Sequence, residues 1–301
     1  MRLERPHGDD IQLVFDLLTR SDIADYGEPD SELSDLRDDW SRMDLSLDAW
    51  VVRDDDNTRV VGYGAVIPSE DGVRFDIYVD PDQVKVGLAA DLLSQCETRS
   101  HSLTAEDEVT GRTFLAHVDP ESKVVFLDAG FVYVQSYYQF HIDLVADLED
   151  PRWPEGISTR TAIPGEDDAE IYRIVQIAFE RSKDEAPTFD QWRTHMTRPG
   201  IYDPELWFVA EVNGEIIGAS LGIKYETEGW IRQLGVIPTW RGKGIATALL
   251  RQSFLRFRER GYERVGLGME AKNEKALNLY KRVGMNVRRQ YDEYCKVYTP
   301  L

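Results

Sequence analysis

The sequence predicts an α/β (α+β) protein made of two tandem copies of one unit. The two halves align at an offset of 157 residues, so that Trp50 falls opposite Trp207 and Gly87 opposite Gly244. In both halves, apolar runs typical of strands alternate with amphipathic runs typical of helices. A length of 301 residues also suits two domains better than one. We therefore expect domains at 1–148 and 156–301, joined by an acidic, proline-containing linker at 149–155.

Each half is expected to run through strand, helices, hairpin, strand, helix, strand, helix and strand. Gly8 and Gly165 are each followed by two acidic residues directly before an amphipathic helical run. Apolar runs at 50–52 and 60–62 predict a hairpin, and the second half repeats this pattern after Trp207. The two halves therefore have the pattern expected of a duplicated unit.

A glycine-rich turn at 241–246, Arg-Gly-Lys-Gly-Ile-Ala, connects a strand-like run to an amphipathic helix. The first N–H groups of such a helix have no partner within it, and they lie at the positive end of its dipole. Two glycines let an anion approach this backbone closely, so the turn predicts a pyrophosphate site. A P-loop would need Lys and Ser or Thr after Gly244, and a dinucleotide fingerprint would need glycine in place of Thr247. An ordinary tight connection is the alternative.

A second helix with a polar start and a glycine stop is predicted at 273–284. Ala276, Leu279, Tyr280 and Val283 fall on one face of this helix, which directs the Tyr280 ring inward. Such a ring can belong to the core, with a partner for its hydroxyl, or it can serve a reaction.

In the order and spacing of these two motifs, the second half resembles the GNAT acyltransferase superfamily. In that family the acyl-CoA pyrophosphate lies on the glycine turn, and the helix tyrosine protonates the departing thiolate. The resemblance implies two GNAT-like domains, each a mixed, mostly antiparallel twisted sheet flanked by helices. It also implies acetyl-CoA as co-substrate and Tyr280 as general acid. The residues that it places around acyl-CoA are Leu234, Gly235, Val236, Arg241, Gly242, Lys243, Gly244, Ile245, Ala246, Thr247, Asn273 and Ala276.

The sequence offers several candidates for a general base. Many GNAT enzymes use a glutamate on the fourth strand, where this chain has Trp-Ile-Arg-Gln at 230–233. Glu228 precedes that strand and is the residue we name, although a solvated turn charge is the simpler interpretation for it and for Glu226. A water chain to a backbone carbonyl would also suffice, since general-base catalysis contributes only about 10²–10⁴-fold. His195 is expected to be a surface or core histidine.

The segment 179–204 is expected to help select the acceptor. Nearby aromatic residues could line the site or belong to the core: Phe179, Phe189, Trp192, Trp207 and Tyr225. Negative charge that suits an amine is carried by Asp184, Glu185 and Glu226.

The first half differs where the chemistry is expected. Lys85 stands opposite Gly242, Phe126 opposite Tyr280 and Asp119 opposite Asn273. A side chain in the turn crowds an approaching anion, Phe lacks a proton to donate, and Asp repels phosphate. We therefore interpret residues 1–148 as a degenerate GNAT-like domain and residues 156–301 as the active one.

Composition narrows the choice of partners. Residues 1–150 carry 12 Lys+Arg against 34 Asp+Glu, and residues 151–301 carry 23 against 21, so the net charge of −20 comes from the first half. This argues against a nucleic-acid partner. Two cysteines and five scattered histidines predict neither a disulfide framework nor a metal site. With no apolar signal core or membrane-length run, we expect a cytoplasmic protein, either a monomeric pseudo-dimer or a homodimer.

Three functions fit the sequence. The leading hypothesis is an N-acetyltransferase that moves an acetyl group from acetyl-CoA directly to a primary amine of a small molecule. The second is a protein lysine or N-terminal acetyltransferase. The third is a CoA-binding or structural module without turnover, which would have no need of Tyr280.

Overall fold

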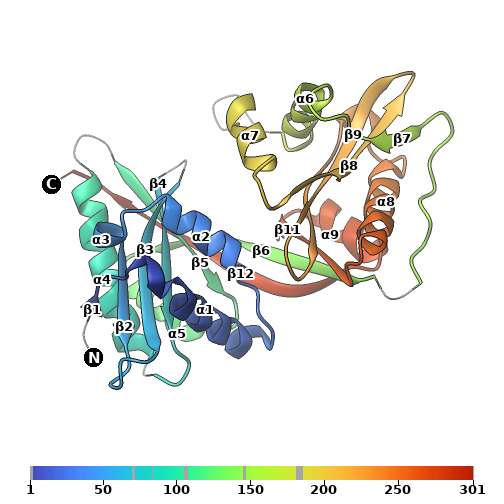
Figure 1. Cartoon of the computed structure of the whole chain (residues 1–301). Coiled ribbons are helices and arrows are strands. Elements are labelled where there is room, and N and C mark those ends of the chain that lie inside the picture. The colour runs from blue at the N-terminus through green and yellow to red at the C-terminus, as the bar shows by residue number, and fades with distance from the viewer. Residues whose placement is uncertain are drawn as a thin grey trace. The chain divides into compact units, whose positions relative to one another are not determined.

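The computed structural model describes residues 3–69, 72–83, 85–104, 108–144, 147–180 and 186–300. The chain forms two compact units (Figure 1). Unit 1 comprises residues 1–138, 270–272 and 289–301, and unit 2 comprises residues 139–269 and 273–288. Each unit is a sheet flanked by helices, which confirms the predicted mixed α/β fold class.

In unit 1 the strands lie in the order β1-β2-β3-β4-β5-β12. Most neighbours are antiparallel, and β4 and β5 are parallel. The elements of this unit are β1 (Leu3–Glu4), η1 (Gly8–Asp10), α1 (Ile11–Tyr26), α2 (Leu33–Ser41), α3 (Leu45–Asp48), β2 (Ala49–Arg53), β3 (Val60–Ser69), β4 (Gly72–Val79), α4 (Lys85–Leu103), β5 (Val109–Ala116), α5 (Pro120–Asp128), the first part of β6 (Val132–Asp143) and most of β12 (Asn286–Tyr298).

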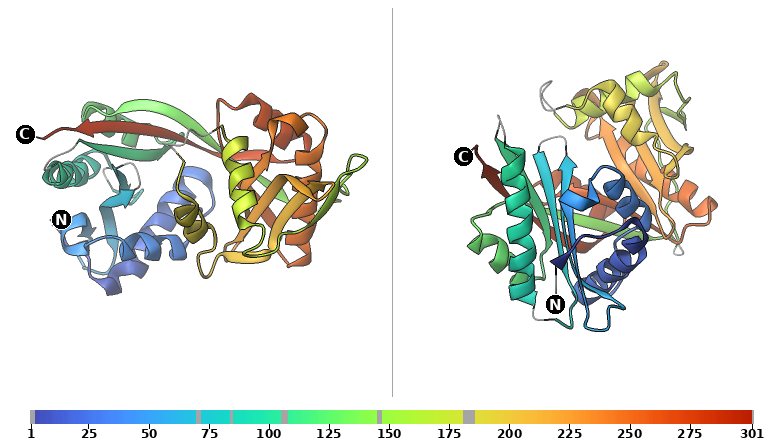
Figure 2. Two further views of the ribbon diagram at one scale, coloured as in Figure 1. Left: turned by 90° about the horizontal axis from the view of Figure 1, so that it is seen from above. Right: turned by 60° about the vertical axis from the view of Figure 1, so that its left-hand side comes forward.

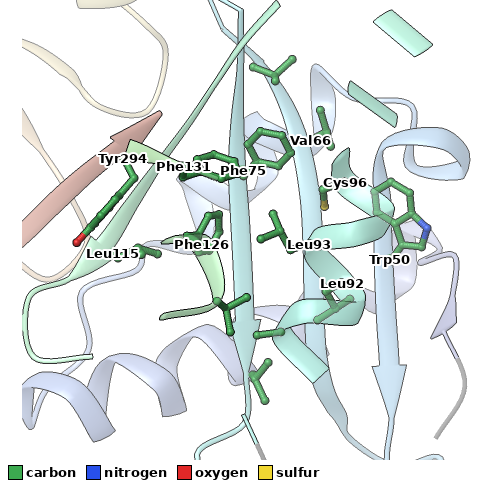
Figure 3. Packing of buried hydrophobic residues seen from close by; sticks show 14 of the residues in the cluster. Trp50, Val66, Phe75, Leu92, Leu93, Cys96, Leu115, Phe126, Phe131 and Tyr294 are labelled. Atoms are coloured by element: carbon green, nitrogen blue, oxygen red, sulfur yellow. The ribbon is translucent and has the colours of Figure 1, made fainter. Parts of the chain in front are cut away.

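The core of unit 1 occupies both faces of its sheet. Trp50 and Val52 pack with Leu92 of α4, whereas the alternate residue Val51 packs with Leu17 of α1. Successive strand residues point to opposite faces, so α4 covers one face and α1 the other (Figure 2, right). Figure 3 shows the α4 side, where aromatic side chains fill the space between the sheet and the helices.

In unit 2 the strands lie in the order β6-β11-β10-β9-β8-β7. β10 is antiparallel to β9 and parallel to β11. The elements of this unit are the last part of β6, β7 (Ser158–Thr161), α6 (Asp168–Ala178), α7 (Phe189–Met196), β8 (Tyr202–Val212), β9 (Glu215–Lys224), β10 (Gly229–Val236), η2 (Pro238–Trp240), α8 (Ile245–Glu259), β11 (Arg264–Glu270), α9 (Glu274–Arg282) and the start of β12.

Helices also cover both faces of the unit 2 sheet. Val236 packs in an apolar cluster with Ile245 and Leu249 of α8. The preceding residue, Gly235, faces α6, where an added Cβ would lie 2.8 Å from Cβ of Ala178. α8 and α6 therefore lie on opposite faces of β10.

The last strand of each sequence repeat completes the sheet of the other repeat. β12 ends the second repeat, but its residues Tyr291–Tyr298 pair antiparallel with β5 in unit 1 (Figure 2, left). Residues 139–143 of β6, which ends the first repeat, belong to unit 2, where the N–H of Leu144 donates to the Glu263 carbonyl. The division into domains at 1–148 and 156–301 stays a prediction about the repeats along the chain.

The predicted local elements of the second half are present. The hairpin after Trp207 is formed by β8 and β9, and the expected strand at 230–236 is β10. The helix predicted at 273–284 is α9, with Asn273 as its N-cap.

Candidate active site

The glycine turn joins η2 to α8 in unit 2. Gly242 has φ = +76° and Gly244, the N-cap of α8, has φ = +88°. Side chains rarely adopt this left-handed conformation, which explains why glycine stands at both positions. An added Cβ would meet nothing within 4 Å at either one. The backbone of the turn is therefore approachable, as an anion site at a helix N-terminus requires.

The side chains around the turn divide into two groups. Ile245 is buried in the α8 cluster, and Ala246 packs against that cluster, so only their backbone N–H groups are suited to an anion. Thr247 is half-buried in the first turn of α8. Lys243 is exposed, and its Nζ lies 4.8 Å from the centroid of the Trp240 ring. Lys243 is therefore the predicted residue whose cationic side chain is best placed to meet phosphate from solvent.

Arg241 is engaged by the protein itself. Its Nη2 donates to the Ala178 carbonyl at 2.9 Å, its Nη1 to Oε1 of Glu180 at 2.9 Å, and its Nε to the Val236 carbonyl at 3.1 Å. The guanidinium thus holds the last turn of α6 beside the end of β10, where the helix dipole favours a positive charge. This fixes the position of the turn.

A split opens between β10 and β11. The two parallel strands pair at Gly229–Val265 and Trp230–Gly266, after which the ladder ends although β10 continues to Val236. The register of β10 against β9 shifts between Ile231 and Gln233, so Arg232 is the extra residue of a β-bulge. The bulge bends β10 directly beyond its last pair with β11. The predicted residues Leu234, Gly235 and Val236 line this open edge.

α9 carries the predicted acid. Oδ1 of Asn273 accepts the N–H of Ala276 at 3.0 Å, so this side chain caps the helix. Tyr280 is the buried residue of α9, with 9% exposure, and its ring centroid lies 5.6 Å from that of Phe140 on β6. Burial raises the pKa of the Tyr280 phenol to about 12. The hydroxyl therefore carries its proton at neutral pH, as a general acid must.

Glu228 lies in a different environment from the solvated turn we expected. It is half-buried, and its Oε2 lies 3.5 Å from Nε2 of His141, a buried residue of β6. His141 contacts the Trp230 ring edge-on at a centroid distance of 6.0 Å. Sequence reasoning missed His141, because nothing in the local pattern of a strand residue relates it to a turn 87 positions later (228 − 141).

Comparison with known proteins places this geometry in a family. A model of the acetyltransferase (GNAT) family matches residues 169–285. A solved GCN5-related N-acetyltransferase from Sphaerobacter thermophilus is 31% identical, with a TM-score of 0.87 over 99% of this chain and 96% of that one.

The chain belongs to the GNAT family of N-acetyltransferases.

Further relatives support the tandem arrangement. A tandem GNAT protein from the clavulanic acid biosynthesis pathway shares the fold, with 16% identity and a TM-score of 0.76 over the full length of both chains. Two relatives named mycothiol acetyltransferase match: one from Frankia alni at 25% identity over 92% of this chain and 89% of the relative, and one from Streptomyces coelicolor at 31% over 46% and 45%. The chain thus spans about half the length of the Streptomyces relative. The tandem layout resembles that of mycothiol synthase.

The aromatic residues expected around a GNAT acceptor site have mixed positions. Trp192 and Trp207 are buried, and their indole N–H groups donate to Oε1 of Gln233 and to the Gly222 carbonyl. Both belong to the core, the second of the two interpretations. Phe179 is exposed and Tyr225 half-buried. The expected charges Asp184 and Glu185 lie outside the described residues.

Two features distinguish the equivalent part of unit 1 from the split in unit 2. The β3–β4 ladder runs from Gly62–Val79 to Ser69–Gly72 without a register shift, so the bulge of β10 has no counterpart there. The Thr113 hydroxyl of β5 donates to the Phe75 carbonyl of β4 at 3.1 Å. The β4–β5 ladder is as short as the β10–β11 ladder, with pairs at Val73–Gly111 and Arg74–Arg112, so the Thr113 hydroxyl is a contact that bridges these strands beyond the ladder.

Two counterparts of GNAT functional residues make structural contacts in unit 1. Phe126, opposite Tyr280, is fully buried against Phe131 (Figure 3). Asp119, opposite Asn273, caps α5 by accepting the N–H of Ser122 at 3.1 Å. The side chain of Lys85 lies outside the described residues.

Gly87→Val is expected to leave the acetyltransferase rate within about twofold of wild type, the usual range for an uninvolved surface position. Gly87 lies inside α4 with a φ outside the left-handed region, and an added Cβ would meet nothing within 4 Å. Steady-state kinetics with acetyl-CoA, with circular dichroism as the check on folding, measures the effect. A large loss of kcat in a folded variant would mean that unit 1 takes part in turnover.

Two properties of the described residues bear on other classes of protein. None of the described helices is long and apolar enough to cross a membrane. Within the same part of the chain, no three His, Cys, Asp or Glu side chains gather in a way that could hold a metal ion. The expected cytoplasmic location and absence of a metal stay predictions.

Proposed function

We propose that this GNAT protein transfers an acetyl group from acetyl-CoA directly to a primary amine of a small molecule. The observation that carries the proposal is the combination, within unit 2, of the open glycine turn, the β10–β11 split and a protonated Tyr280. Each of these features serves a different part of one reaction. A module that only bound CoA would have no use for the third.

Binding is assigned to the turn and the split. The N–H groups at the start of α8 and the Lys243 ammonium receive the pyrophosphate. The edge of β10 from Leu234 to Val236 can pair with the amide groups of the pantetheine arm, because β11 does not occupy it. Arg241 contributes by fixing α6 against the turn, and Asn273 and Ala276 form the start of α9.

The chemical step needs a polarised carbonyl and a protonated leaving group. Backbone N–H groups that the bulge and split free on β10 are suited to stabilise negative charge on the thioester oxygen. Tyr280 then gives its proton to the thiolate as the carbon–sulfur bond breaks. Both groups act on charge that develops during the reaction, so they favour the transition state over the bound substrates.

The class of acceptor is supported by relatives. Two of them are named for the acetylation of mycothiol, a small molecule, at 25–31% identity. This favours a small amine over a protein, while identity at this level does not carry over the acceptor itself. We therefore propose the class, a primary amine of a small molecule, and acetyl as the acyl group.

The test has two stages. Isothermal titration of the full chain with acetyl-CoA measures binding, and release of CoA thiol is then followed with glucosamine, putrescine, cysteine methyl ester and a lysine-containing peptide. Binding with turnover on small amines is the expected result. Turnover only on the peptide would favour the protein acetyltransferase, and binding without turnover on any amine would favour the non-catalytic module.

A further inference from the structure

At the closed end of the split, His141, Glu228 and Trp230 form a cluster to which the proposed reaction assigns no role. Trp230 and Gly266 form the last pair of the β10–β11 ladder, so the split begins directly beyond them. Gly266 is covered by two rings, since an added Cβ would lie 2.4 Å from the Trp230 indole and 2.5 Å from the His141 imidazole. Glu228 lies beside the imidazole.

The cluster and Tyr280 lie on opposite faces of the sheet. Phe140 and His141 are consecutive residues of β6, so their side chains point to opposite faces. Phe140 contacts Tyr280, and His141 contacts Trp230. A thioester held in the split would therefore have the acid for its leaving group on one face and the His141–Glu228 pair on the other.

The ring nitrogens of His141 lack hydrogen-bonding partners among the described residues, although Glu228 lies close by. Nε2 of His141 lies 3.5 Å from Oε2 of Glu228, and neither ring nitrogen has a hydrogen-bonding partner in the described part of the chain. The imidazole is only 6% exposed, and an unmade hydrogen bond at a buried polar group costs about 1–3 kcal/mol. With its proton on Nδ1, the imidazole turns an acceptor nitrogen towards an acceptor oxygen. A donor with several N–H bonds would satisfy both atoms.

We propose that His141 and Glu228 form the subsite for the acceptor's ammonium group and that His141 is the general base of the transfer. The proposal rests on the proposed N-acetyltransferase function. An ammonium has three N–H donors and a positive charge, which match one imidazole nitrogen and one carboxylate. The half-buried rings of Trp230 and Tyr225, with centroids 6.5 Å apart, provide aromatic surface of the kind that attracts cations.

The proton balance of the step is complete. One proton of the ammonium passes to Nε2 of His141, whose positive charge then faces the Glu228 carboxylate. The freed lone pair forms the carbon–nitrogen bond, the carbon–sulfur bond breaks, and the thiolate takes the proton of Tyr280. The second proton of the amine replaces the one on Tyr280, and the third stays on the amide. His141 releases its proton to solvent, which restores the enzyme.

Two matched probes test the base directly. Ethylamine is an ammonium near neutral pH, whereas methoxyamine, of nearly the same size, is uncharged and needs no base before attack. His141→Gln keeps an acceptor atom but cannot take a proton, so kcat with ethylamine should fall by about 10²-fold or more while kcat with methoxyamine stays within about threefold. Glu228→Gln should lower kcat/KM for ethylamine selectively, since it removes the charge that binds the ammonium.

Three further measurements complete the design. Glu215→Gln, which changes an exposed carboxylate at the start of β9, is the control and should change both rates by no more than about twofold. The His141→Gln/Glu228→Gln double variant should lose little more than the worse single variant, because the two residues act as a unit. Acetyl-CoA affinity by titration should be unchanged in all of them.

The outcomes separate this inference from the function on which it rests. Equal losses with both probes, or no loss with ethylamine, would overturn the role of the pair while leaving the acetyltransferase in place. The ratio of the two rates within one preparation is independent of how much protein is folded, and Glu228→Gln changes a partly exposed residue. A wild-type chain that acetylates neither probe and no amine of the panel would contradict the proposed function, and the subsite with it.

Discussion

Tyr280→Phe is expected to lower kcat by roughly 10²–10⁴-fold, the range for loss of a positioned general acid, with acetyl-CoA binding nearly unchanged. Burial raises the pKa of the phenol to about 12, so the hydroxyl is protonated at every pH at which the enzyme would be assayed. The ring contacts Phe140 and would do so without its oxygen. Phe126 already fills the equivalent place in unit 1, which shows that the fold accepts phenylalanine there.

The loss from Tyr280→Phe should appear in kcat and kcat/KM alike, because the thiolate forms only late in the reaction. Tyr294→Phe is the matched control, since it removes the hydroxyl of another buried tyrosine, in unit 1. Single-turnover rates should be measured beside steady-state rates to establish that chemistry is rate-limiting. If chemistry limits turnover and the rate falls less than about fivefold, Tyr280 is a core residue and not the acid.

Gly244→Val is expected to abolish turnover and to weaken acetyl-CoA binding by at least about 1.4 kcal/mol, or tenfold. The side chain would stand in the open space above the turn, and the left-handed φ of +88° would force the backbone to change. Gly242→Val should also weaken acetyl-CoA binding by at least about tenfold. Its φ is +76°, and its side chain would likewise stand in the open space that the phosphate needs. Titration calorimetry with acetyl-CoA measures both changes.

Gly261→Val separates lost binding from lost stability. Gly261 follows α8 at its other end, also has φ = +88°, and has nothing within 4 Å of an added Cβ. It should cost a similar amount of stability in urea unfolding, about 1–2 kcal/mol for a left-handed side chain, without a specific loss of affinity. Equal affinities for the Gly244 and Gly261 variants would remove the pyrophosphate site from the turn.

Features that depend on local pattern could be predicted from the sequence. The glycines of the turn need a left-handed backbone that few other residues adopt, so their spacing indicates the turn without knowledge of the fold. Asn273 is a favoured capping residue directly before a helix, and the spacing of apolar residues places Tyr280 inward. The roles of these residues in binding and catalysis remain proposals.

Features that depend on tertiary pairing could not be predicted. β6 and β12 are equivalent strands of the two repeats. Neither composition nor periodicity therefore indicates that β6 lies beside β11 and β12 beside β5, and not the reverse. The Trp-Ile-Arg-Gln run has no pattern that predicts the bulge at Arg232, because the bulge arises from the pairing of β10 with β9. His141 enters unit 2 through the exchange of β6, so the local sequence around Glu228 indicates only a solvated turn residue.

Arg241 shows a related limit. A basic residue beside a phosphate turn suggests a direct ion pair with phosphate. In the structure its guanidinium instead joins Ala178, Glu180 and Val236. The sequence predicts correctly that Arg241 lies in the glycine turn. The direction of its side chain depends on α6, which lies more than 60 positions earlier, and could not be predicted.

The exchange of β6 and β12 has a consequence for synthesis of the chain. During translation the first repeat leaves the ribosome with its β5 edge bare, because the strand that pairs with it in the finished protein, at 291–298, follows the other elements of the second repeat. A bare edge is a template for strand addition by another chain, so nascent unit 1 is open to such pairing until residues 291–298 are made. A gene cut at the linker would give two fragments that each lack a strand, and the C-terminal fragment would also lack His141. Because each repeat supplies a strand to the other, deletion of either repeat would leave the remaining sheet incomplete.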